Sequence, residues 1–362
     1  MRRYAWRLKV LALGALSCGL SLALNITLIL AQEAGSGEGI RLSAEQLRPA
    51  LQVQHDHEAQ LLSLPGVVGV GVGLTEDTDQ LAIHIYRNVD VPGASAAALP
   101  AQLNGLPVRV LETDPIVARD GPPGTNHRQG FDSPVPMGVS TGNDNGCFVG
   151  TLGYRVFRIG QPSKVGYLTN AHVAAAGGAG LCPGKAAHGE DQFQPGLLDS
   201  GCSPVLPKIG DLVQYVPIVF GGKFENTVDA AFVASSRSLV NKLILDIGNP
   251  SPSVVAPALN QTVRKSGRTT GLTKGTITTV NATINVIYES GCGTAKFVGQ
   301  IGITPGSFSA AGDSGAPILT SMKDSSGRYR PVGLLFAGSS TTTFANRLSD
   351  VLGALGAVID TQ

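Results

Sequence analysis

Residues 311–317 read Ala-Gly-Asp-Ser-Gly-Ala-Pro and run into a short apolar segment, Ala316–Thr320. Ser314 therefore stands in a tight turn directly before a predicted strand. The glycines on either side give the backbone angles that other residues avoid, and they expose the serine hydroxyl. They also let the backbone amides of Gly312 and Ser314 face an oxygen that gains negative charge. Ser314 is thus a candidate nucleophile with a candidate oxyanion hole beside it.

A serine hydroxyl is a weak nucleophile and needs a histidine base that a carboxylate orients. The chain has six histidines, and the last of them is His188, so the base must precede Ser314. This order excludes an α/β-hydrolase, in which the histidine follows the serine. The G-x-S-x-G motif of that fold is also missing, because Ala316 stands where its second glycine belongs.

One histidine and one carboxylate upstream have the surroundings that this chemistry needs. His172 ends an apolar strand in residues 166–173 (GYLTNAHV), and Asp229 opens a buried strand in residues 226–233 (NTVDAAFV). With Ser314 they follow the order His, Asp, Ser, which is one of the known chain orders of a catalytic triad. The separations are 57 residues from 172 to 229 and 85 residues from 229 to 314.

Residues 169–172 (Thr-Asn-Ala-His) and 312–315 (Gly-Asp-Ser-Gly) resemble the T-x-A-H and GDSG motifs of trypsin-like serine peptidases, and the chain is most similar to their bacterial members. The resemblance covers residues 138–359. It implies a mainly β fold, namely a chymotrypsin-like double β-barrel, and an endopeptidase that works through an acyl-enzyme. It also implies that Ser314 is the nucleophile and that His172 is the general base and then the acid.

The same resemblance assigns further roles. Asp229 would fix the tautomer of the imidazole, and the amides of Gly312 and Ser314 would form the oxyanion hole. Substrate-binding residues would be Phe308, at the base of the primary pocket, and Phe336, Ala337 and Gly338, on the strand that pairs with bound peptide. Since position 308 is not an aspartate, we expect a small or apolar side chain before the scissile bond rather than Arg or Lys.

Residues 265–274 (KSGRTTGLTK) and the Asn/Cys-rich start at 143–150 depart from the digestive enzymes of this family and resemble its bacterial members instead. Asp313 is the acid next to the nucleophile. In members that are cut from a zymogen, the acid next to the nucleophile pairs with a new amino terminus. No Ile-Val-Gly-Gly start is present in this chain, so we do not expect that mode of activation.

The amino-terminal residues 1–31 resemble an export segment. Four basic residues precede an uncharged run from Val10 to Ala31, which has the form of a secretion signal and is also long enough to span a bilayer. A cleaved signal and a retained membrane anchor are both open readings. In either case the rest of the chain lies outside the cytoplasm, secreted, periplasmic or anchored.

The remaining chain divides into two predicted domains. Residues 32–42 are a Gly/Ser/Glu-rich linker. A helix over 43–62, with a Ser43–Gln46 capping box, and strands near 67–74, 81–87 and 107–111 predict an α+β module over 43–118. This module is either a pro-region or a permanent interaction domain. A Gly/Pro-rich linker, 119–136, leads to the peptidase domain, 137–362, which consists of many short strands and a late helix over 344–359.

Four cysteines follow the export segment: Cys147, Cys182, Cys202 and Cys292. In an oxidising compartment they allow two disulfides with three connectivities. We expect a Cys182–Cys202 bond, because it closes one Gly/Pro-rich loop, and hence Cys147–Cys292; free thiols are the alternative. No metal-ligand spacing is present, so neither a metal nor a cofactor is expected.

The composition limits the other possibilities. Of 362 residues, 43% are apolar and 15% charged, which excludes a disordered chain. The net charge of +1 gives no reason to expect a nucleic acid partner. The expected partner is a peptide or protein substrate, with membrane contact only through residues 10–31 if they are retained. Two alternatives stay open: a catalytically silent binding protein on the protease fold, and an esterase that uses the same triad.

Overall fold

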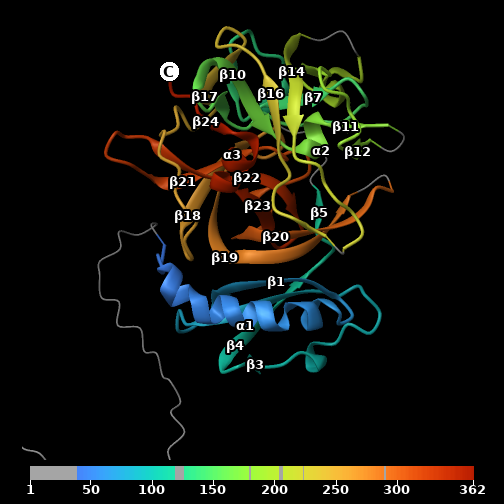
Figure 1. Ribbon diagram of the computed structural model, residues 1–362, viewed down its shortest axis with the longest axis vertical. Coiled ribbons are helices and arrows are strands. Elements are labelled where there is room, and N and C mark those ends of the chain that lie inside the picture. The colour runs from blue at the N-terminus through green and yellow to red at the C-terminus, as the bar shows by residue number, and fades with distance from the viewer. Residues whose placement is uncertain (1–38, 119–125, 179–180, 204–206, 223, 289–290) are drawn as a thin grey trace, which may run out of the picture. The chain divides into compact units, whose positions relative to one another are not determined.

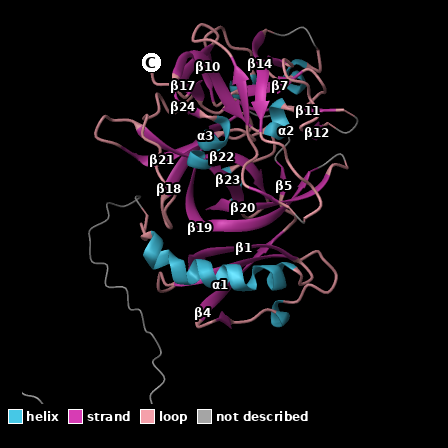
Figure 2. Cartoon of the chain, viewed as in Figure 1, coloured by secondary structure: helices cyan, strands magenta, loops and turns pink. Residues whose placement is uncertain are grey.

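Short apolar segments separated by glycine and proline form strands through most of the chain (Figures 1 and 2). The structure is a computed structural model that describes residues 39–118, 126–178, 181–203, 207–222, 224–288 and 291–362. The described residues belong to one compact unit. They are mainly β, as predicted. The apolar run 10–31 lies outside the described residues, and within these residues no helix is long and apolar enough to cross a membrane.

The first half of the predicted peptidase domain, together with a strand from its C-terminal end, forms an eight-stranded sheet. Its strands, in spatial order, are β24 (Ala357–Ile359), β9 (Arg155–Arg158), β10 (Gln161–Thr169), β16 (Ala231–Ala234), β14 (Lys208–Tyr215), β13 (Asp191–Phe193), β7 (Ser140–Asn143) and β8 (Gly150–Thr151). The second half of β10 and most of β16 are buried against this sheet's apolar core. The chain segments next to these two strands, which carry His172 and Asp229, therefore have fixed positions.

Six strands of the second half pair in a ring that closes on itself. In order around the ring they are β18 (Thr262–Gly267), β19 (Gly271–Tyr288), β20 (Gly293–Thr304), β23 (Thr343–Arg347), β22 (Tyr329–Gly338) and β21 (Pro317–Lys323), which pairs again with β18. The turn that carries Ser314 directly precedes β21. The ring thus places the nucleophile at the end of one of its own strands.

Residues of the predicted α+β module continue the sheet of this ring. The helix α1 (Ala44–Leu62) has the predicted capping box, in which Ser43 and Gln46 bond each other's backbone. The strands β1 (Val67–Leu74), β2 (Leu81–Asn88), β4 (Leu106–Thr113) and β3 (Gln102–Leu103) follow. β1 pairs antiparallel with residues 279–284 of β19, just beyond the stretch of β19 that pairs with β18.

One apolar core spans the module and the ring. It combines Ala50 and Val53 of α1 with Leu259, Ile277 and Ile303 of the ring region. Apolar burial is worth about 1.5–3 kcal/mol for each large aliphatic side chain. Removal of residues 43–118 would therefore expose part of the ring's own core.

The remaining elements are short. They are η1 (Ala96–Ala98), β5 (Val117–Ala118), η2 (Asn126–Arg128), β6 (Val135–Met137), α2 (Ala171–Ala174), β11 (Ala176–Gly177), β12 (Cys182–Pro183), η3 (Leu197–Ser200), β15 (Glu225–Asn226), β17 (Val240–Ile244), η4 (Gly306–Phe308) and α3 (Leu348–Leu355).

The predicted helix over 344–359 is wrong at both ends. Only α3 is helical; the residues before it form β23 and those after it form β24. Phe344 and Ala345 are fully buried, and β23 is paired with β20 and β22. Ladder pairing on both edges outweighs the local helical pattern. Gly356, with φ of 58°, ends α3.

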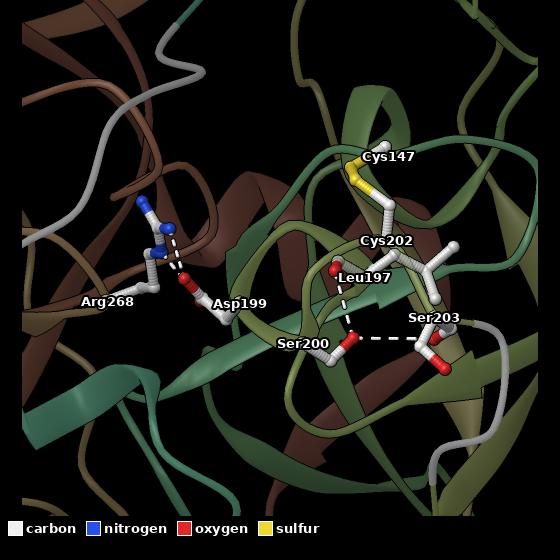
Figure 3. The surroundings of a disulfide bond; sticks show 7 residues. All are labelled: Cys147, Leu197, Asp199, Ser200, Cys202, Ser203 and Arg268. Carbon is white, nitrogen blue, oxygen red and sulfur yellow. Dashed lines mark hydrogen bonds and ion pairs between the residues drawn. A yellow bond between two sulfur atoms is a disulfide. The ribbon is translucent and has the colours of Figure 1, made fainter.

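The predicted disulfide pairing is also wrong. Cys147 is bonded to Cys202, and Cys182 to Cys292 (Figure 3 shows the first bond). Chain distance alone favoured the nearest pair, but a disulfide needs two Cα atoms about 4.4–6.8 Å apart. The fold brings Cys292, between β19 and β20, to 5.5 Å from Cys182, measured between Cα atoms. This bond links the region after α2 to the ring.

Candidate active site

His172 and Asp229 are in direct contact. His172 lies on α2, the short helix that follows β10, and Asp229 lies just before β16, which is paired with β10. The distance from His172 Nδ1 to Asp229 Oδ2 is 2.5 Å. Asp229 is fully buried, and the side chain of His172 is 3% exposed. A buried carboxylate at this distance orients the imidazole by accepting from one ring nitrogen, which fixes the tautomer of the ring.

Four donors hold the carboxylate of Asp229. Oδ1 accepts from the amides of Ala171 at 2.7 Å and of His172 at 3.2 Å. Oδ2 accepts from the His172 ring and from the hydroxyl of Tyr288 at 2.9 Å. The amide of Asp229 in turn donates to the side chain of Asn346. These hydrogen bonds hold the carboxylate in one orientation.

Ser314 lies in a turn in which two positions have backbone angles that favour glycine. Gly312 and Gly315 have φ of 94° and 91°. Thr151 ties this turn to the eight-stranded sheet, because its hydroxyl donates to the Gly312 carbonyl at 2.9 Å and its amide donates to the Ser314 carbonyl at 2.7 Å. The Ser314 hydroxyl lies 3.4 Å from the carbonyl oxygen of Phe336 on β22.

One glycine separates Ser314 from the helix that carries His172. A Cβ added at Gly150 would meet the side chain of Val173, on α2, at 2.4 Å and the carbonyl oxygen of Ser314 at 3.1 Å. The backbone of Gly150 therefore lies between α2 and the serine turn, with no room for a side chain. The serine turn and α2 thus lie on either side of Gly150.

Asp313, beside the nucleophile, has an internal cation as its partner. Lys265 on β18 is fully buried, and its Nζ lies 3.5 Å from Asp313 Oδ2. Burial lowers the pKa of the Lys265 ammonium, and the neighbouring Asp313 carboxylate opposes that shift. The carboxylate also accepts from the amides of Thr269 and Ala310 at 2.8 and 3.0 Å. The acid therefore has a cationic partner that is not a chain terminus.

The strand edge expected to bind peptide already carries a segment of the same chain. β5 pairs antiparallel with β22, with Ala118 opposite Ala337 and Val117 opposite Gly338. Upstream of β5, the carboxylate of Asp114 accepts from the amide of Ser340 at 2.7 Å and from its hydroxyl at 3.0 Å. Residues 114–118 thus run along the end of β22.

The predicted pocket residue Phe308 lies on η4 and is 1% exposed. Its ring belongs to the apolar core that the ring of strands shares with α1. Phe336, Ala337 and Gly338 are likewise buried. Ser314 itself has no exposed surface. The described conformation is therefore one in which the candidate nucleophile is covered.

Sequence reasoning missed the groups that support the site. Tyr288, Asn346 and Lys265 contact Asp229 or the serine turn. Tyr288 and Asn346 lie in segments that the sequence presents only as a strand and a helix, and Lys265 lies in no predicted element. A buried ammonium group needs a partner, but only the fold shows that Lys265 is buried. Among the described residues, no three His, Cys, Asp or Glu side chains form a metal-binding group.

Comparisons with known proteins match the chain to solved structures of bacterial chymotrypsin-fold serine proteases. Protease A of Thermobifida fusca is 20% identical with a TM-score of 0.40, and the match covers 63% of this chain and 99% of that one. The chymotrypsin of Cellulomonas bogoriensis is 22% identical with a TM-score of 0.40, covering 64% and 100%. A glutamic acid-specific serine protease is 18% identical with a TM-score of 0.41, covering 62% and 100%. No family model and no curated protein matches the chain.

Proposed function

We propose that the chain is an exported serine endopeptidase with a chymotrypsin-like double β-barrel over residues 137–362. The closed ring of six strands is the second barrel of this proposal, and the eight-stranded sheet supplies the first. The observation that carries the proposal is the contact between His172 and a fully buried Asp229, together with a serine in a glycine-flanked turn.

The reaction follows from these positions. His172 takes the proton of the Ser314 hydroxyl as the serine oxygen attacks the scissile carbonyl carbon, and Asp229 stabilises the resulting imidazolium. The backbone amides of Gly312 and Ser314 stabilise the oxyanion of the tetrahedral intermediate. His172 then gives the proton to the leaving amine, which breaks the peptide bond and leaves an acyl-enzyme. A water molecule, deprotonated by His172, releases the acid and restores Ser314.

We infer that the full chain is a latent form. A peptide substrate would pair with β22 at Ala337 and Gly338, where β5 pairs in this conformation. β5 belongs to the chain segment that leads out of the module at residues 43–118, so this module acts as a pro-region that covers the site. The two disulfides suggest an extracytoplasmic location. They agree with an export function for residues 1–31. The primary pocket, with Phe308 at its base, would accept a small or apolar side chain.

The test is peptide cleavage by the intact chain and by a nicked chain. A recognition sequence for a foreign protease is inserted at residues 121–124, and the module is left attached because it shares its core with the ring. The nicked chain is then incubated with a mixture of synthetic peptides, and the products are identified by mass spectrometry. Matched preparations carry Ser314→Ala or His172→Ala.

We expect the nicked chain to cleave peptides faster than the intact chain, and both variants to be inactive. Cleavage of esters without cleavage of peptides would replace the endopeptidase with an esterase. Inactivity of the nicked chain towards both would support a binding protein on the same fold. Activity that survives Ser314→Ala would contradict the mechanism.

A further inference from the structure

Tyr288 joins the triad from the other half of the domain. It is the last residue of β19, in the six-strand ring, whereas His172 and Asp229 lie next to β10 and β16 of the eight-stranded sheet. Its side chain is nearly buried, and its hydroxyl donates to Asp229 Oδ2 at 2.9 Å. The same oxygen accepts the hydrogen bond of His172 Nδ1. Tyr288 and His172 therefore share one acceptor atom.

This shared acceptor has an electrostatic consequence. A hydroxyl that donates to Oδ2 draws negative charge away from the oxygen that stabilises the imidazolium. Without that hydroxyl, Oδ2 carries more charge and holds a protonated His172 more strongly. A general base is most effective when it is unprotonated at working pH and still basic enough to take the serine proton. The Tyr288 hydroxyl therefore weakens the hold of Oδ2 on a protonated His172.

The ring of Tyr288 is held on several sides, so its hydroxyl has little freedom. It packs edge-on against Phe220, with ring centroids 5.5 Å apart, and edge-on against His172 at 5.9 Å. Phe297 lies behind it at 6.3 Å. The Cys182–Cys292 disulfide, near the end of β19, ties this hairpin to the region after α2. A hydroxyl fixed in this way acts as a preorganised dipole.

We propose that Tyr288 is a positioning residue of the triad, which orients the Asp229 carboxylate and sets the basicity of His172. The proposal rests on the proposed function only in that His172 is taken as the base of the reaction. Tyr288 keeps its proton throughout, and no bond forms or breaks at it. Asp229 contacts the His172 ring through its hydrogen bond, and Tyr288 contacts it through its own ring. Asn143, which β7 directs towards the α2 carbonyls, is neutral.

The test is the pH titration of the His172 imidazole in the full chain. NMR of imidazole nitrogens labelled with nitrogen-15 monitors this titration. The variant His172→Gln identifies the resonance by removing it. Tyr288→Phe keeps the ring and removes the hydroxyl. Tyr154→Phe is the matched control, because it removes another buried tyrosine hydroxyl, one that donates to the Ile318 carbonyl instead. A fourth protein carries 3-fluorotyrosine at position 288, which keeps the fold and makes the hydroxyl a stronger donor.

We expect the midpoint of the His172 titration to rise by about half a pH unit or more in Tyr288→Phe, as for the loss of one hydrogen bond to a charged group. The fluorotyrosine protein should shift the midpoint downward, and Tyr154→Phe should leave it unchanged. Identical midpoints in wild type, Tyr288→Phe and the fluorotyrosine protein would overturn the proposal.

This readout does not depend on turnover. If the nicked chain proves inactive on peptides and esters, the proposed function fails, while the NMR titration still decides whether Tyr288 acts on His172. If the chain is active, the acid limb of kcat/KM against pH should move with the NMR midpoint, and KM should stay near its wild-type value.

Discussion

Replacement of Lys265 by methionine tests how the serine turn is held. Lys265 and Asp313 are both fully buried, and their charged groups are 3.5 Å apart. Methionine has a similar length and no charge, so Lys265→Met leaves the Asp313 carboxylate buried without its cation. The Lys265 ammonium also donates to the Gly271 carbonyl at 2.8 Å, a bond that is lost as well.

The expected cost follows from the environment of the carboxylate. Breaking a buried ion pair by removing one partner costs about 3–5 kcal/mol. Asp313 keeps donors from the amides of Thr269, Thr270 and Ala310 and from the Thr270 hydroxyl. These bonds continue to stabilise the charge, so we expect a loss of about 3 kcal/mol, at the lower end of that range. This is a large part of the 5–15 kcal/mol that is usual for a folded domain.

The assay is urea-induced unfolding followed by circular dichroism, for wild type, Lys265→Met, Asp313→Asn and the double variant. We expect each single variant to lose stability and the double variant to recover part of the loss, because no unpaired charge remains. A Lys265→Met protein whose unfolding free energy lies within about 1 kcal/mol of the wild-type value would refute the reasoning, because a change that small is typical of an ordinary substitution. Full additivity of the two substitutions would also refute it.

Three further predictions concern the cover, the pH response and a disulfide. Asp114→Ala removes two hydrogen bonds to Ser340 that hold the covering segment. If the cover loses about 1.4 kcal/mol of stability, the rate of fluorophosphonate labelling of the intact chain should rise by about tenfold or more. The control Asp77→Ala, on an exposed turn, should leave this rate unchanged. Burial lowers the pKa of His84 from 6.5 to about 4, so the folded state favours neutral His84 and loses stability as the pH falls through that window. The difference in unfolding free energy between wild type and His84→Gln should change by up to about 3 kcal/mol between pH 7 and pH 4, and a constant difference would contradict this. Replacing Cys182 and Cys292 together by alanine opens a 110-residue loop and should lower the unfolding free energy, measured by chemical denaturation, by about 2–4 kcal/mol. An unchanged unfolding free energy would mean that the bond does not form.

The local parts of the fold could be predicted from the sequence. The capping box of Ser43 and Gln46 begins a helix, and the alternating glycines and valines of 67–74 form the predicted strand. His172, Asp229 and Ser314 were candidates because each lies in a short motif with a fixed relation to a strand end. The contact between His172 and Asp229 joins segments that are 57 residues apart in the chain.

The rest depends on contacts between distant segments. The pairing of β1 with β19 joins residues about 210 positions apart, and no local pattern in either strand specifies it. The segment 344–347 has a helical pattern, but strands on both sides pair with it. Tyr288 ends an ordinary apolar strand, and only the fold shows that its hydroxyl reaches Asp229.

The measurement that tests the central claim most directly is the site of fluorophosphonate modification on the chain nicked at residues 121–124. The intact protein is weighed by mass spectrometry, digested and mapped. The account predicts one adduct, located at Ser314, and none when His172 or Asp229 is replaced by alanine. An unmodified Ser314 in the nicked wild-type chain, or equal modification without His172, would contradict the claim that His172 and Asp229 activate Ser314.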